Sequence, residues 1–441
     1  MDLPLLLAAV ERGDDDAALE LLYDATADDL AGDDAVALLA AAARAGRERV
    51  VDHLVVWDVD VTRPWDGGVD PVTWAAENGR YWVLRALLSR SRDPLSSDSP
   101  HRRALRTAQE ALASGVGAGS EPSPAHRAVL TDLEAELGVH RSPDELMARA
   151  LVHADPDHDD WFASVFHLGR RTSRETFDWA LEAARDTSNL DRRRFGLDTM
   201  ESLAIAFSVE VEQEHDAELP FAREAEDFLR PLLDSEQDPR TLDIVIAAFN
   251  SYSSVDMVPA ILAHADHADP RVRRTVSAML HTNPNTAKHE EALAALTRLA
   301  DDSTPTIRTN ALSGLATSAL DTPELRAVFA AHLADPFFDA RLEAAAGLAL
   351  RDDERGLTAL NEIRSGIKNT NSPGWGRLCD IHHLLRVRAE AAGQDGGERT
   401  LLVTGPGICR ATATGHTAEG TGGHLHRDGR TPGRIRCTPE G

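Results

Sequence analysis

The fold is decided by the stretch Asp269-Pro270-Arg271-Val272-Arg273-Arg274-Thr275-Val276-Ser277-Ala278-Met279-Leu280. A proline at the first position of a helix is favourable, because the N–H that it lacks would have no partner there. Small or apolar residues then follow the early arginine at spacings that form one helix face, namely Val276, Ser277, Met279 and Leu280. The stretch therefore predicts an amphipathic helix that begins at an Asp-Pro turn.

The same pattern returns twice downstream. Arg308 lies 35 residues after Arg273, and Arg341 lies 33 residues after Arg308. The matching small and apolar residues are Ala311, Leu312, Gly314 and Leu315 in one copy and Ala344, Ala345, Gly347 and Leu348 in the other. A step of that length holds one pair of helices, so we expect each pair to bury an apolar face against the next.

Weaker copies precede the clear ones. Asp238-Pro239 opens a unit in which Leu242 takes the place of the arginine, and Arg193 heads an earlier unit. The acidic insert Glu210 to Glu218 delays the unit that follows Arg193. A first unit is expected to pair two aromatic segments, one around Trp161, Phe162 and Phe166 and the other around Phe177, Trp179 and Leu181.

These repeats resemble the HEAT family, in the short form that also occurs in phycobilin lyases, over about residues 145–392. The resemblance implies an all-α solenoid, with a ladder of Asp and Arg side chains bonding neighbouring repeats. It also implies function by binding, because many members of such families offer a concave surface to a partner.

A second period, of 33 residues, opens the chain. Gly13, Gly46 and Gly79 each follow an alanine-rich phrase that ends a short helix, and each precedes a second helix with an apolar face. Glycine suits such a position because it adopts positive φ without strain. With the phrase Asp70-Pro71-Val72-Thr73, this region resembles the ankyrin repeat over residues 1–113. The helix of residues 102–113 is expected to be a fourth unit or a cap.

The two arrays predict the domain organisation. Residues 114–144 are interpreted as a flexible linker, rich in Gly, Ser and Pro at its start, followed by a connecting helix. Residues 393–441 are rich in Gly, Thr, Arg and His and poor in apolar residues, which predicts a disordered tail. The prediction is thus an all-α protein of two α-solenoids, 1–113 and 145–392.

Composition limits the function classes. Acidic residues number 73 against 46 basic ones, for a net charge of −27, which disfavours nucleic acids and anionic membrane surfaces as partners. Only three cysteines occur, so a disulfide framework is not expected. The sequence shows no signal peptide and no apolar run of the ~20 residues that span a bilayer. We expect a soluble, cytoplasmic protein.

Two turns combine imidazoles with carboxylates, residues 153–160 and residues 264–269. Both residue types bind metals, yet Asp is also the usual cap of a HEAT turn, and the solvated cap is the favoured interpretation. No metal, cofactor or catalytic residue is therefore predicted. The single His289-Glu290 dipeptide is not enough for the di-iron site that some HEAT proteins carry, and no P-loop, Gly-x-Ser-x-Gly or Cys-x-x-Cys motif occurs.

The ankyrin resemblance places Trp65 at the tip of a projecting hairpin, between Arg63 and Asp66. Exposed aromatic residues often anchor interfaces, so these three residues are the predicted contacts for a protein partner, which the net charge suggests is basic. The alternative is that Trp65 packs within the hairpin. The predicted function is a non-catalytic interaction scaffold; the alternative is a HEAT-type lyase or chaperone that acts on a bound cofactor or client protein.

Overall fold

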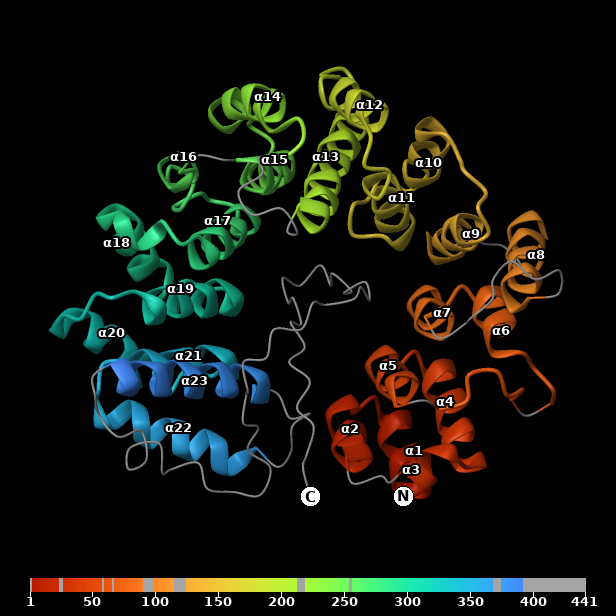
Figure 1. Cartoon of the computed structure of the whole chain (residues 1–441), viewed down its shortest axis with the longest axis horizontal. Helices are drawn as coiled ribbons and strands as arrows, with labels where there is room; N and C mark the ends of the chain where they lie inside the picture. The colour runs from red at the N-terminus through yellow and green to blue at the C-terminus, as the bar shows by residue number, and fades with distance from the viewer. Residues whose placement is uncertain are drawn as a thin grey trace. The chain divides into compact units, whose positions relative to one another are not determined.

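The computed structural model describes residues 2–23, 27–57, 59–65, 67–89, 99–114, 124–211, 219–253, 256–367 and 374–391. The fold is an all-α helical repeat, as predicted (Figure 1). Among the described residues the β-structure consists of an isolated antiparallel bridge between Trp65 and Val69. The predicted tail 393–441, the first part of the predicted linker at 115–123 and most of the acidic insert, 212–218, lie outside the described residues.

The chain forms two compact units, residues 1–261 and 262–441, each with most of its contacts inside itself. The helices of the first unit are α1 Leu3–Arg12, α2 Asp15–Tyr23, α3 Ala27–Ala31, α4 Asp33–Ala45, α5 Glu48–Val56, α6 Pro71–Glu77, α7 Tyr81–Leu88, α8 Pro100–Ser114, α9 Pro124–Glu136, α10 Pro143–Ala150, α11 Asp159–Gly169, α12 Arg174–Ala184, α13 Leu190–Val211, α14 Ala222–Ser235 and α15 Pro239–Tyr252. A short α16 spans Val258–Leu262.

The first unit has two layers. One layer runs from α2 through α5, α7, α9, α11 and α13 to α15, each helix packing on the next (Figure 1). The other layer contains α1, α4, α6, α8, α10, α12 and α14. The apolar interior between α1 and α9 consists mainly of Ala, Leu and Val from both layers, together with Trp65 and Tyr81. Burial of this face, at about 25 cal/mol per Å² of apolar surface, is the main stabilising contribution.

The three predicted glycines do end helices or follow them directly. Gly13, Gly46 and Gly79 have φ values of 76°, 68° and 59°. A side chain from a later helix covers each turn: a Cβ on Gly13 would lie 2.8 Å from the Arg47 guanidinium, one on Gly46 would lie 3.3 Å from that of Arg80, and one on Gly79 would lie 2.6 Å from the His126 imidazole. These positions therefore need glycine for backbone conformation and for space.

The predicted boundary at 114–144 does not separate compact units. The contacts continue across it, since α8 packs on α6 and α9, and α9 packs on α7 and α11. The repeats resembling ankyrin and the helices that follow them thus share one pair of layers, and the boundary between compact units falls at 261/262.

Arg85 of α7 shows why the layers are continuous. Its guanidinium lies 4.6 Å from the ring centroid of Phe166 on α11 and 5.8 Å from that of Trp82. The same guanidinium pairs at 3.6 Å with Asp132 of α9, a buried carboxylate that also contacts His167. Cation–aromatic contacts of this kind are stronger when water is excluded. One arginine thus joins three successive helices of the layer.

The predicted pairing of the first aromatic segments is confirmed in part, because Trp179 of α12 packs against the same apolar cluster as Trp161 of α11. Trp161 of α11 is buried with Leu146 of α10 and Phe195 of α13. Phe177 of α12 faces the other way along the stack, with its ring 4.8 Å from that of Phe221. Consequently α11 packs on α10 and α13, while α12 packs on α13.

The second unit is a shorter stack of helices. Its helices are α17 Pro270–Thr282, the 3₁₀ helix η1 Thr286–Lys288, α18 Glu290–Leu299, α19 Pro305–Thr317, α20 Pro323–His332, α21 Phe338–Ala349, α22 Glu354–Gly366 and α23 Trp375–Ala391. The helices α17, α19 and α21 pack in sequence, and α18, α20 and α22 pack against them (Figure 1). α23 covers the end of the stack through an apolar cluster that contains Leu378 and Ile381.

The predicted Asp/Arg ladder is present in this unit. The Arg273 Nε donates to Asp302 at 2.7 Å, and both nitrogens of the Arg308 fork donate to Asp335 at 2.8 and 2.9 Å. Each aspartate also accepts a backbone N–H two residues later, so it caps one turn while it binds the preceding repeat. The Asp335 side chain is only 4% exposed.

In the first unit, the arginine that pairs with the aspartate of the next Asp-Pro turn is one residue later than the Arg193 that the sequence predicted. Arg194 donates to Asp238 at 2.8 Å, and the neighbouring Arg193, which the sequence favoured, pairs with Glu236 at 2.9 Å. Both side chains occupy the first turns of α13.

Candidate functional site

Trp65 is not the exposed anchor that the sequence predicted. Its side chain is 3% exposed, and its ring lies 5.2 Å from that of Trp74. Its backbone N–H donates to the Val69 carbonyl at 2.8 Å, while its buried indole Nε1–H has no hydrogen-bond partner among the described residues. The guanidinium of Arg44 covers the ring at 5.5 Å. A hairpin does form here, but the tryptophan turns inward because burial of its large apolar surface is favourable. The packing alternative describes this residue.

The other two predicted contacts have different outcomes. Arg63 is exposed and forms an ion pair with Asp33 of α4. Asp66 lies outside the described residues. Partner contact through this hairpin therefore stays a prediction, with Arg63 as its exposed residue.

A group of carboxylates lies at the amino ends of three helices in one layer of the first unit. Asp15, Glu48 and Asp159 are the first residues of α2, α5 and α11. Burial, together with the charges of Asp159, Asp52 and Asp15, raises the pKa of Glu48 to about 7. The group therefore favours the approach of positive charge, which would relieve this repulsion.

The turn of residues 153–160, between α10 and α11, contacts both neighbouring regions of the layer. Arg240 of α15 donates to Asp155 and Asp157, each at 2.7 Å. On the other side, Trp82 of α7 donates its Nε1–H to Asp159 at 3.2 Å. Three of the four carboxylates in the turn thus bind groups from other helices.

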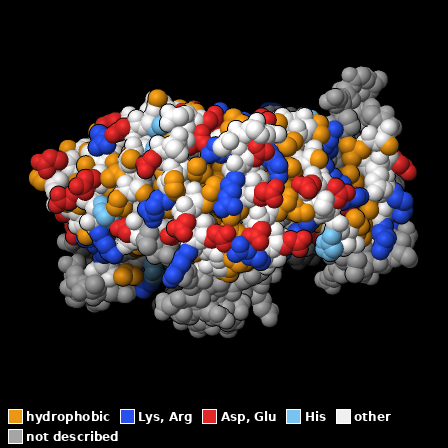
Figure 2. All heavy atoms as spheres, turned by 90° about the horizontal axis from the view of Figure 1, so that it is seen from above, with side chains coloured by type: hydrophobic (Ala, Val, Ile, Leu, Met, Phe, Trp, Pro, Cys, Tyr) orange, Lys and Arg blue, Asp and Glu red, His pale blue; other side chains and the backbone are white. Residues whose placement is uncertain are grey.

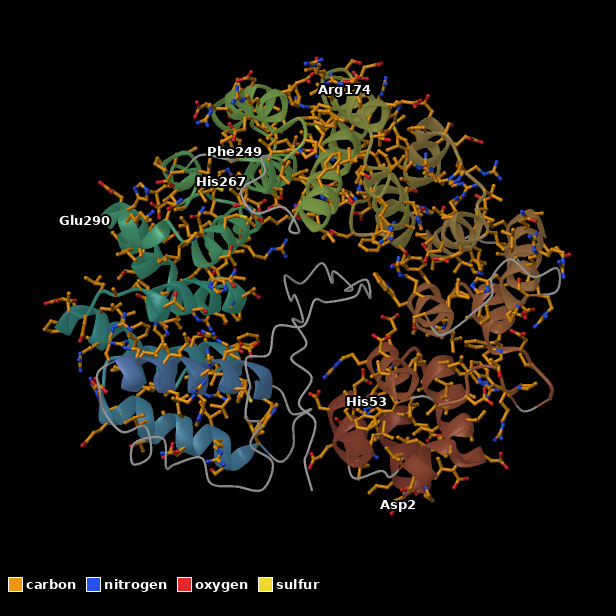
Figure 3. The ribbon with its side chains drawn as sticks, viewed as in Figure 1. Asp2, His53, Arg174, Phe249, His267 and Glu290 are labelled. Atoms are coloured by element: carbon orange, nitrogen blue, oxygen red, sulfur yellow. The ribbon has the colours of Figure 1, made fainter. Side chains whose placement is uncertain are left out.

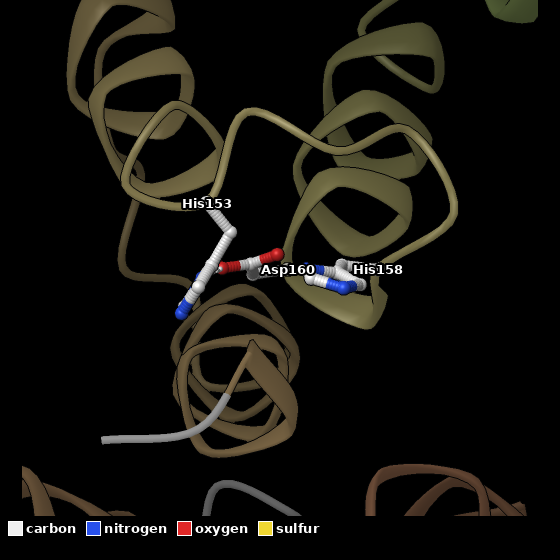
Figure 4. Close-up of side chains that lie close together, drawn as sticks. All are labelled: His153, His158 and Asp160. Carbon is white, nitrogen blue, oxygen red and sulfur yellow. Dashed lines mark hydrogen bonds and ion pairs between the residues drawn. The ribbon is translucent and has the colours of Figure 1, made fainter. Parts of the chain in front are cut away.

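The fourth carboxylate, Asp160, lies with two imidazoles (Figure 4). His153, His158 and Asp160 each offer a ligand atom, and these atoms lie within 4.8 Å of one another. The His153 Nδ1 is 2.8 Å from the Asp160 Oδ2, and the rings of His153 and His158 are 5.4 Å apart. Asp160 is 1% exposed, and its Oδ1 accepts the Trp161 N–H at 3.0 Å.

The other His-rich turn does not gather ligands in this way. His267, which Figure 3 shows before α17, accepts the Asp269 N–H through its Nδ1 at 3.0 Å. Asp266 forms an exposed ion pair with Arg298 at 2.8 Å. These contacts cap and link turns of the second unit, as the sequence interpretation favoured.

A hollow of about 680 Å³ lies between α12 and α14 of the first unit and is lined by Arg185, Arg223, Glu224, Asp227, Phe228, Pro231 and Leu232. Charged side chains and the apolar Phe228, Pro231 and Leu232 together line the hollow, which is open to solvent. It lacks the enclosed apolar walls with a few converging polar groups that are typical of a cofactor site.

Charge is distributed over the surface in small groups. Figure 2 shows acidic and basic side chains interspersed over the face in view, with no extended basic patch on that face. Sequence reasoning missed Glu48 as a site residue, because it lies 111 positions from Asp159 and only the helix stack brings them together. Its only local signal is an acid at the first position of a helix, which is common.

Comparison with protein families supports part of the second array. A family model for HEAT repeats matches residues 258–351. The crystal structure of YibA from Escherichia coli is similar at 16% sequence identity over 60% of this chain and 91% of that chain, with a TM-score of 0.42. No curated protein sequence matches the chain. Among the described helices, none has the length and apolar character needed to cross a membrane. Residues 258–351 are thus HEAT-like repeats.

Proposed function

We propose that the protein is a non-catalytic scaffold that binds a protein partner with basic character, in the cytoplasm. The observation that carries the proposal is the architecture itself. Helix pairs stack with their apolar faces buried, and ion pairs such as Arg308–Asp335 join neighbouring repeats. Such stacks leave one row of helices free to contact a partner along its length.

The charge of the partner follows from the acidic group at Asp15, Glu48 and Asp159. A lysine or arginine placed beside Glu48 would stabilise its charged form and would be attracted by the net charge of −27. Nucleic acid and anionic membrane do not suit this surface. A lyase or chaperone function is the alternative, and it would need a deeper apolar cleft than the hollow beside α14.

The test uses the full chain and a defined probe, a fluorescent peptide of alternating Lys and Gly. We expect anisotropy to show binding that weakens at least threefold in Glu48→Gln and little in Glu11→Gln, an exposed acid of α1 that serves as the matched control. Equal affinity of both variants would refute the assignment of this surface.

The scaffold function itself is tested by affinity capture followed by quantitative mass spectrometry. The proposal predicts a basic protein whose recovery falls with Glu48→Gln and with added salt but persists with Glu11→Gln. Enrichment of a small molecule that is converted on incubation would instead favour the enzymatic alternative.

A further inference from the structure

We propose that His153, His158 and Asp160 bind a divalent first-row transition metal, with Zn²⁺ as the representative ion. These residues belong to the turn between α10 and α11 and were favoured as solvated caps on sequence grounds. Their arrangement points to coordination for three independent reasons: the spacing of the ligand atoms, the lack of an arginine or lysine at Asp160, and a sheltered imidazole nitrogen.

The spacing suits a single ion. Zn²⁺ bound at 2.0–2.2 Å in a tetrahedron requires ligand atoms about 3.3 Å apart. The His153 Nδ1 and the Asp160 Oδ2 are already 2.8 Å apart, and all three ligand atoms lie within 4.8 Å of one another. The His158 ring is half-exposed, so its rotation can bring the third ligand atom closer to the other two.

Asp160 is the most buried carboxylate of this turn, and no arginine or lysine of the described residues pairs with it. Arg240 binds Asp155 and Asp157, and Trp82 binds Asp159. The buried Asp160 contacts the His153 imidazole and the Trp161 backbone N–H. A buried carboxylate is costly without a counter-charge, and a divalent ion would supply one.

His158 presents a second unused group. Its Nδ1 is sheltered from solvent and has no hydrogen-bond partner among the described residues. A buried nitrogen in that state loses solvation without compensation, which a metal bond would restore. His158 is also the residue that precedes α11, so the helix fixes its position relative to Asp160, the second residue of that helix.

The chemistry of the donors selects the ion. Two imidazoles and one carboxylate suit Zn²⁺, Co²⁺ or Ni²⁺, whereas Mg²⁺ and Ca²⁺ prefer oxygen ligands alone. Three protein ligands leave at least one position for water. Because the turn also holds Arg240 and Trp82, a bound ion would fix the point where α7, α11 and α15 are connected.

The experiment titrates ZnCl₂ into the chelator-treated full chain by isothermal calorimetry, and repeats the titration with His158→Ala, Asp160→Asn and His140→Ala. His140 is an exposed histidine in the loop before α10 and is the matched control. We expect one Zn²⁺ per chain, a loss of affinity of at least about tenfold in His158→Ala and Asp160→Asn, and no change in His140→Ala.

Two further measurements keep the outcome decisive. His158→Ala should fold without metal, since the His158 Nδ1 has no hydrogen-bond partner among the described residues and its Nε2 lies 3.7 Å from the partly exposed Asp155, a weak contact. A Zn²⁺-induced rise in melting temperature should vanish in this variant. Should either variant fail to fold, Co²⁺ added to the parent protein must give the intense visible bands of a tetrahedral site. Absence of those bands, no binding below 100 µM Zn²⁺ (on the order of −5 kcal/mol), or equal affinity of His158→Ala and His140→Ala would overturn the proposal.

Discussion

The first repeats and the HEAT-like repeats of residues 258–351 stack with a similar step but by different chemistry. In the first, Arg47 and Arg80 lie over glycine turns, and Arg80 donates to the Arg44 carbonyl near the end of α4. In the second, Arg273 and Arg308 bind buried aspartates of the next turn. In both regions a cation reaches across to a neighbouring repeat, and both contain Arg–Asp ion pairs, but the carboxylates are buried only in the second. Asp302 and Asp335 are 7% and 4% exposed, whereas Asp70, the least exposed of the paired aspartates in the first repeats, is 27% exposed.

The difference teaches where each region is vulnerable. A helix end offers its carbonyls at any pH, so the contacts at Gly13 and Gly46 respond to space and backbone conformation. A buried ion pair responds to loss of either partner and to acid. Substitutions and acid that weaken one kind of contact should therefore destabilise one region more than the other.

Trp65→Ala should lower the free energy of unfolding of the first repeats more than any other change considered. Removal of a buried tryptophan costs about 3–5 kcal/mol of folding free energy, because the space between Trp74 and Arg44 would be left empty. Denaturant unfolding measures the change, with Trp57→Ala as the control, since Trp57 is 56% exposed and should cost less than about 0.5 kcal/mol. A Trp65→Ala chain as stable as the control would restore the idea of an exposed contact.

Acid should weaken the second region more than the first. The Arg308 guanidinium and backbone N–H bonds lower the pKa of Asp335 from 3.8 to about 2. A lowered pKa means that the stabilisation is complete above pH 3.8 and is lost as pH falls toward 2, by on the order of 2 kcal/mol. Hydrogen exchange should show α19 and α21 losing protection in this window before α4 and α6. Simultaneous loss in both regions would argue against distinct stacking chemistry.

Gly46→Ala should cost about 1–2 kcal/mol, since a side chain at a φ of 68° is strained and its Cβ would press on Arg80. The control is Gly376→Ala in α23, where a Cβ meets no neighbour and the helix should be unharmed or slightly stabilised. Thermal unfolding separates the two variants. Equal melting temperatures would show that the glycine turn has no role in stacking.

Glu48→Gln should give the smallest change and the opposite sign. The pKa of Glu48 is raised from 4.5 to about 7, so its ionisation opposes folding as pH rises through this range. The variant should match the parent at pH 4.5 and exceed it by on the order of 1 kcal/mol at pH 8, after allowance for solvent screening. A constant difference across pH would show that charge is not the cause, and Glu11→Gln should show no difference at either pH.

The sequence was informative where a pattern repeats locally. Asp-Pro turns, the spacing of Arg273 and Arg308, and the glycines at 33-residue steps all reflect contacts within one repeat or its neighbour, so α1 to α7 and α15 to α21 were predictable. The HEAT-like assignment of 258–351 is confirmed. The ankyrin resemblance stays a prediction.

Contacts between distant helices were not predictable in the same way. Nothing local distinguishes Arg85 from other arginines, yet its bonds to Asp132 and the ring of Phe166 make the layer continuous across the predicted linker. The sequence placed Trp65 at the surface because the hairpin tip of an ankyrin repeat is exposed. In this protein the Trp65 ring packs against Trp74 and is buried. The turn at His153 and Asp160 required a fold to show that the two side chains meet.

The buried ladder of the second unit is tested most directly by two double-mutant cycles. One joins Arg308→Ala and Asp335→Ala, whose side chains are 12% and 4% exposed; the other joins Arg298→Ala and Asp266→Ala, at 54% and 69%. We predict a coupling of about 2–3 kcal/mol for the buried pair and less than about 1 kcal/mol for the exposed pair. Equal couplings would contradict the account, because burial would then add nothing to the bond between repeats.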